Sequence, residues 1–122
     1  MTRRLGMAMF AAILGLSRIV WAAAPQLQTP LMFANGTDFI VCLATNVGTV
    51  PIATVTVSVV DGANVTQNTT TCSNLAPGEP CQAETQQDAR CAISFTGSKK
   101  NIRGYVTVGD AAQNMKATIP AN

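Results

Sequence analysis

Residues 39–62, FIVCLATNVGTVPIATVTVSVVDG, contain the pattern that decides the fold. Residues 39–44 are apolar at every position, which is typical of a strand buried on both faces. Residues 46–51 combine turn-forming side chains, and residues 53–59 then alternate strictly between apolar and hydroxyl side chains. A period of two with one polar face predicts a half-buried antiparallel strand. The stretch therefore predicts two strands joined by a turn, and Asp61-Gly62 provides the next turn.

The rest of the chain repeats this strand pattern, and nothing after the first 22 residues has helical periodicity. Pro30 marks an edge strand because it cannot donate a ladder hydrogen bond, and residues 63–72 predict an exposed edge strand or a mobile loop. Met115, Ala117 and Ile119 are expected to share one face of the last strand. We expect an all-β, immunoglobulin-like antiparallel β-sandwich of seven or eight strands. The expected strands are residues 27–34, 39–44, 53–59, 81–85, 91–96, 102–108 and 114–119, with residues 63–72 as a strand or a loop. The expected core residues are Val55, Val57, Val59, Ile93, Phe95, Val106 and Val108.

The first 22 residues read as a helical secretory signal peptide. A basic start at residues 3–4 precedes an apolar run over residues 5–16. Val20 and Ala22 are small enough for the two positions before the cleavage site that a signal peptidase recognises. The apolar run is shorter than the ~20 residues of a membrane span. We therefore expect cleavage after Ala22, a sandwich domain over residues 23–122, and a secreted or periplasmic location.

Charge argues against two classes of partner. Without the first 22 residues the chain keeps five basic and six acidic residues, a net charge of about −1. Such a domain has no electrostatic footprint for nucleic acid or anionic membranes. The basic residues gather at Lys99, Lys100 and Arg103, which predict a solvated hairpin tip or, alternatively, a contact for an anion or an acidic glycan. The expected partner is an unidentified protein or glycan at the cell surface, or a second copy of the chain.

Four cysteines follow the signal sequence, which predicts two disulfides in an exported domain. Three pairings exist, and the strand alternation favours one of them. Cys91 shares a face with Ile93 and Phe95, and Cys42 fits the inward face of its own strand, so these two cysteines can bridge the two sheets. Cys72 and Cys81 bracket a turn and can join locally. A zinc or redox site is the alternative, but the spacings contain no C-x-x-C pair.

The turn motifs add a family resemblance. Residues 46–52, the valines at 55, 57 and 59, and Leu75-Ala76-Pro77-Gly78-Glu79 resemble the N-x-G-T-x-P … V-x-V … L-x-P-G-E pattern of CARDB-like and related bacterial extracellular immunoglobulin-like domains. The resemblance covers residues 38–85. It implies an adhesion, spacer or ligand-contacting module, with no catalytic motif to transfer. Those domains typically lack cysteines, so the four cysteines here indicate a distinct group.

The sequence offers little catalytic chemistry. It contains no histidine, which excludes Ser-His-Asp and Cys-His arrangements. Its acidic residues form no close pair and no calcium-loop spacing, and no glycine-rich phosphate loop is present. We therefore expect a non-enzymatic module for binding, adhesion or surface structure, without cofactor or metal. The alternatives are a small secreted hydrolase that uses scattered carboxylates, and an assembly subunit or inhibitor.

One surface follows from the alternation around Cys42. If Cys42 faces inward, then Phe39, Val41 and Leu43 face outward and form an apolar stripe on the sheet. Soluble domains rarely expose contiguous apolar area beyond a few hundred Å². Either residues 27–33 or the C-terminal segment folds over the stripe, or the stripe is a surface for a partner or a second copy.

Overall fold

A computed structural model describes residues 26–110 and 115–122, and the signal peptide expected at residues 1–22 lies outside them. The described chain contains the strands β1 (Gln26–Gln28), β2 (Phe39–Asn46), β3 (Ile52–Asp61), β4 (Thr66–Leu75), β5 (Pro80–Thr85), β6 (Ala89–Phe95), β7 (Ile102–Gly109) and β8 (Met115–Pro120), and the short 3₁₀ helix η1 (Lys99–Asn101).

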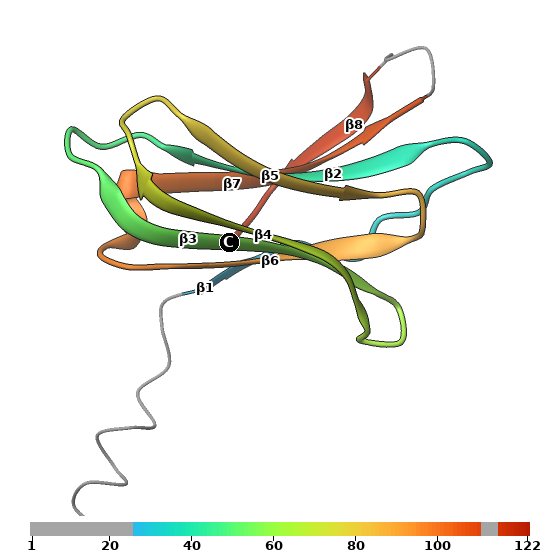
Figure 1. Cartoon of the computed structure of the whole chain (residues 1–122). Coiled ribbons are helices and arrows are strands. Elements are labelled where there is room, and N and C mark those ends of the chain that lie inside the picture. The colour runs from blue at the N-terminus through green and yellow to red at the C-terminus, as the bar shows by residue number, and fades with distance from the viewer. Residues whose placement is uncertain (1–25, 111–114) are drawn as a thin grey trace, which may run out of the picture.

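These strands form two antiparallel sheets that lie face to face (Figure 1). The first sheet has the strand order β1-β6-β3-β4, and the second sheet has the order β5-β2-β7-β8. Every strand pair is antiparallel. The arrangement confirms the predicted all-β sandwich.

Strand β3 shows how the alternating sequence builds the sandwich. Val55, Val57 and Val59 point inward and are fully buried. Its hydroxyl residues point outward, where Thr56 bonds Thr71 on β4 through their Oγ1 atoms at 3.3 Å. The seven residues expected in the core are all buried. The register read from the alternation is therefore correct in the central strands.

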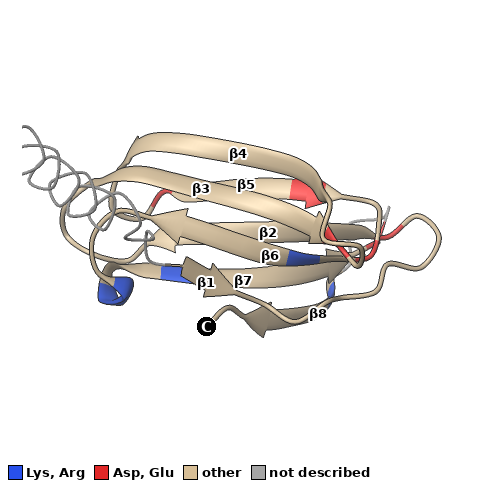
Figure 2. Ribbon diagram, turned by 90° about the horizontal axis from the view of Figure 1, so that it is seen from below, with Lys and Arg blue, Asp and Glu red and all other residues tan. Residues whose placement is uncertain are grey.

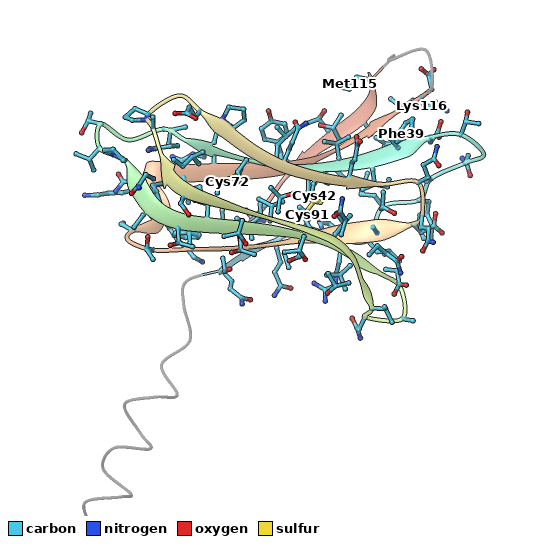
Figure 3. All side chains as sticks on the ribbon, viewed as in Figure 1. Phe39, Cys42, Cys72, Cys91, Met115 and Lys116 are labelled. Carbon is cyan, nitrogen blue, oxygen red and sulfur yellow. A yellow bond between two sulfur atoms is a disulfide. The ribbon has the colours of Figure 1, made fainter. Side chains whose placement is uncertain are left out.

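Both predicted disulfides are present. Cys42 on β2 joins Cys91 on β6, and the bond lies between the two sheets (Figure 3). Cys72 on β4 joins Cys81 on β5. Because β4 and β5 are edge strands of different sheets, this second bond also connects the sheets, along one side of the sandwich.

The opposite side of the sandwich is closed by the chain after β8. Gln28 and Asn122 exchange two backbone hydrogen bonds, at 2.8 and 3.0 Å, which join β1 of the first sheet to the residues that follow β8 of the second. Strand β1 is shorter than expected, because Pro30 interrupts it. Beyond the proline only the isolated pair Met32 and Ala89 continues the ladder.

Candidate functional site

The outer face of the second sheet carries a row of apolar side chains along β2. Burial alternates strictly along this strand: Cys42 and the other inward residues are fully buried, whereas Phe39, Val41 and Leu43 are half-buried. We call these three residues the β2 strip. Residues two apart in a strand share a face, so the disulfide at Cys42 fixes the strip on the outside.

Neighbours within the second sheet cover the β2 strip in part. Val41 is opposite Glu84 on β5 and Thr107 on β7, at a spacing where side chains touch. Residues 27–33 do not fold over the strip, because β1 and Met32 pair with β6 in the first sheet. Of the C-terminal segment, β8 extends the second sheet beside β7, and Met115 lies beside the strip.

A shallow depression of about 470 Å³ lies next to the β2 strip. Phe39 and Val41 line it on one side, and Met115 on β8 lines it on the other. Met115 is 69% exposed, and it lies on the same side of the second sheet as Phe39 (Figure 3). The remaining lining residues are Glu84, Thr107, Gly109 and Asp110.

A β-bulge at Lys116 turns Met115 to this outer face. Strand β8 pairs regularly with β7 as far as Ala117, but the next pair joins Gly109 to Met115 and leaves Lys116 without a partner in the ladder. One extra residue reverses the alternation of side chains. The expectation that Met115 shares a face with Ala117 and Ile119 is therefore wrong. Nothing in the local pattern of residues 115–120 marks the bulge.

Lys116, the bulge residue, forms an ion pair with Asp38. Its Nζ donates to both carboxylate oxygens of Asp38, at 2.9 and 3.0 Å. Asp38 directly precedes β2 and is only 3% exposed, and its Oδ2 also accepts the backbone N–H of Asn35. The hydrogen bond from Lys116 lowers the pKa of Asp38, and the bond from Asn35 lowers it further, against the effect of desolvation. The ion pair holds the start of β8 near the start of β2, and so holds Met115 near Phe39.

The predicted anion contact lies at the other end of β7. Lys99 and Lys100 belong to η1, and Arg103 is the second residue of β7. The Nη1 of Arg103 donates to the carbonyl oxygens of Ile102 at 2.9 Å and of Lys99 at 3.4 Å. Lys99 and Arg103 line a second open depression, of about 500 Å³, and Lys100 is not part of its lining. The structure thus brings two of the three residues together, and anion binding stays a prediction.

The motif that carries the family resemblance forms a buried corner. Asn46 is fully buried, and its Nδ2 donates to the carbonyl oxygens of Val50 and Leu75, each at 2.8 Å. Its Oδ1 accepts the backbone N–H of Gly48 at 2.9 Å. Its own backbone groups bond the turn at residues 78–79. The side chain therefore ties the β2–β3 turn to the β4–β5 turn, which is a structural role.

Two further carboxylates, those of Asp61 and Asp88, hold turns and loops in place. Asp61 accepts the backbone N–H of Val65 and the side-chain amide of Gln67, and the bond from Val65 contributes most to its lowered pKa. Asp88 accepts the backbone N–H of Ala34 at 2.7 Å. Across residues 26–110 and 115–122, no three His, Cys, Asp or Glu side chains gather in a way that could hold a metal ion.

Comparisons with known proteins do not assign the chain to a family. No family model matches the sequence, and no curated protein or solved structure is significantly similar to it. Within the part of the chain that the structure describes, no helix is both long and apolar enough to cross a membrane. The β2 strip and its depression are thus the candidate site on geometric grounds.

Proposed function

We propose that the protein is an exported, non-enzymatic β-sandwich module that binds a partner through the outer face of its second sheet. The observation that carries this proposal is the β2 strip with the exposed Met115 beside it. A half-covered apolar patch of this kind on a soluble domain indicates an interaction surface. Export is supported by the two disulfides, because such bonds persist in oxidising compartments.

The chemistry of the depression favours a partner that inserts an apolar side chain. Phe39 provides a rigid aromatic wall, and Met115 provides a flexible, polarisable one that can adapt to the inserted group. Glu84 and Asp110 give the depression an acidic rim. An apolar centre with a polar rim is the usual anatomy of a protein interface, so we propose a protein partner at the cell surface or in the periplasm.

A site-specific cross-linking experiment tests this surface. A photoreactive amino acid is placed at Val41 on the strip, and, as the matched control, at Thr56 on the outer face of the first sheet. In the producing cells, position 41 should give a discrete adduct and position 56 should give none. Adducts of equal intensity from both positions, or none from position 41, would overturn the proposed surface.

Two further measurements test the rest of the proposal. Cell fractionation should find the protein outside the cytoplasm and shortened by about 22 residues. A broad hydrolase panel should show no turnover by the purified protein. Turnover that a single Asp or Glu substitution abolishes would replace the binding module with a hydrolase.

We also propose that the sandwich is immunoglobulin-like and CARDB-like. Its central pairs β2–β5 and β3–β6, with a disulfide from β2 to β6, follow the B–E and C–F pairs and the B–F disulfide of immunoglobulin domains. The outer strands depart from that order, because β1 lies beside β6 and β7 lies beside β2. Backbone contacts between β1 and β6, measured by NMR, would test this strand order.

A further inference from the structure

Three of the four sheet edges in the described chain are protected from pairing with a strand of another molecule. Strand β1 has three residues, and Asn122 bonds its outer side. Strand β8 contains the bulge at Lys116 and ends at Pro120. Strand β5 begins at Pro80 and carries the charged Glu84. Short length, charge, proline and bulges are the devices by which proteins protect sheet edges.

The fourth edge, β4, lacks most of these devices. It has ten residues, TQNTTTCSNL, with no charged side chain and no proline. It forms one margin of the first sheet, and no charge lies along it (Figure 2). Its pairing with β3 shifts register near Val60, at the start of β4, and Asn74 near the end of β4 has a positive φ of 51°. The stretch between these two points is uncharged, threonine-rich and regularly paired with β3, and such an edge is a template for a further strand.

The hydrogen bonds of β3 show which backbone groups of β4 face outward. Thr54 directs its N–H to the hydroxyl of Thr96 and its C=O to the N–H of Thr96, so both groups point toward β6. Thr54 is the register partner of Ser73 on β4. In an antiparallel ladder the two groups of a residue point to the same side. Ser73 therefore faces away from β3 with both its N–H and its C=O.

A second hydrogen bond supports the same assignment. The N–H of Thr69 donates to the side chain of Asn68 at 2.9 Å, which places it on the outer side of β4. Residues two apart share this orientation, so Thr71, between Thr69 and Ser73, also faces outward. The β4 edge thus presents the backbone groups of Thr71 and Ser73 and the C=O of Thr69 on its outer side, whereas the N–H of Thr69 is already bonded to Asn68.

We propose that the β4 edges of two copies of this chain pair antiparallel about Thr71 and form one eight-stranded sheet. A strand that meets its own copy places like residues near each other, so a charged edge would repel itself. Strand β4 carries no charge, which favours this occupant. The hydroxyl row formed by Thr56 and Thr71 would continue across the new pair as threonine–threonine contacts.

The fold also holds β4 ready for pairing. The disulfide from Cys72 to Cys81 fixes its second half to β5. The side-chain amide of Asn68 donates to the carbonyl oxygen of Glu84 on β5 at 3.2 Å and fixes its first half. A strand that is already ordered loses little conformational entropy on association. The β4 edge is separate from the β2 strip, so the experiments can reject the dimer without rejecting the proposed partner surface, and the reverse.

Sedimentation velocity of the purified protein tests the proposal, at concentrations up to about 1 mM, the weak end of specific association. The parent should form a dimer. Thr71→Pro should weaken the dimer at least about tenfold without loss of fold, because proline is tolerated where the N–H faces outward. Ser94→Lys, on the same face but on β6, should leave the dimer unchanged.

Charge pairing and amide exchange make the test specific to this edge. Thr71→Lys alone and Thr71→Glu alone should each be monomeric, and an equimolar mixture should recover the dimer, because position 71 meets itself across the symmetry axis. Hydrogen exchange at the amides of Thr71 and Ser73 should slow on dimerisation. A parent that stays monomeric, a dimer that Thr71→Pro does not affect, or protection confined to another edge would each overturn the proposal.

Discussion

Replacing Asn46 with alanine should destabilise the domain by about 2–4 kcal/mol. The side chain makes three hydrogen bonds to backbone groups: two from Nδ2, to Val50 and Leu75 at 2.8 Å, and one to Oδ1, from Gly48 at 2.9 Å. A buried polar group that loses its partner costs about 1–3 kcal/mol. The Leu75 bond is fully buried, and the other two are partly buried, so water recovers part of their loss. For a domain of about 100 residues, the melting temperature should fall by roughly 10–30 °C.

Thermal and urea unfolding of parent and variant measure this loss. The matched control is Asn68→Ala, because Asn68 also bonds two backbone groups, those of Thr69 and Glu84, but on the exposed surface. That control should lose less than about 1 kcal/mol, because water replaces both bonds. Equal losses in the two variants would show that the burial of the Asn46 amide is not what stabilises the corner.

A pH series on Asn46→Asp sharpens the same prediction. The substitution keeps the acceptor for Gly48 but faces a carboxyl oxygen toward the carbonyl oxygens of Val50 and Leu75. Burial and these carbonyls favour the protonated acid, so the pKa of the introduced carboxyl is raised in the folded state. When the pKa of a carboxyl is higher in the folded state than its unfolded value of about 3.9, protonation stabilises the fold at pH values below about 3.9. This stability is lost as the pH rises through the folded-state pKa. The deficit of the variant relative to the parent should therefore widen from pH 4 to pH 7, and a constant deficit would contradict this account.

Three further predictions concern the core, the ion pair and the disulfides. Phe95→Ala should cost about 3–5 kcal/mol, because Phe95 is 2% exposed and leaves a large cavity; an unchanged melting curve would contradict its inward register. Because the folded-state pKa of Asp38 lies below its ordinary value of 3.8, the Asp38 carboxylate stabilises the fold above pH 3.8, and this contribution is lost as the pH falls through the folded pKa. Asp38→Asn and Lys116→Met should therefore each lose less stability than the parent when the pH is lowered into the acid range. Replacing Cys42 and Cys91 with alanine should cost about 4 kcal/mol in urea unfolding, against about 2.5 for the other disulfide, because the sequence separations are 49 and 9 residues.

The strands and disulfides could be predicted because their signals are local. Over residues 53–59 of β3 the apolar and hydroxyl residues alternate strictly, so Val55 and Thr56 could be assigned to opposite faces from the sequence alone. The same parity placed Cys91 inward and thereby selected its partner, Cys42. Pro30 indicated an edge, and the structure shows that it also ends β1 after three residues.

The surroundings of the candidate site could not be predicted, because they depend on contacts distant in sequence. Met115 reaches the outer face only through the bulge at Lys116, and that bulge is accompanied by an ion pair with Asp38, 78 residues earlier in the chain. The order of the strands likewise rests on long-range pairs, such as β1 with β6, for which no local pattern exists. The alternation of side chains with a period of two describes a regular strand, and it does not predict the position of a β-bulge.

The corner at Asn46 bears on what the family resemblance can say about function. The N-x-G-T and L-x-P-G-E motifs meet there, because Asn46 bonds Gly48 and Val50 in the first motif and Leu75 in the second. The Asn46 side chain thus docks the two turns through their backbone groups, which is a role in folding that does not depend on what the domain binds. The resemblance therefore bears on how the chain folds more than on what it does. Function must be sought in side chains that the fold does not require, such as Met115, which is exposed on the outer face of the second sheet, and the uncharged residues along the free edge of β4.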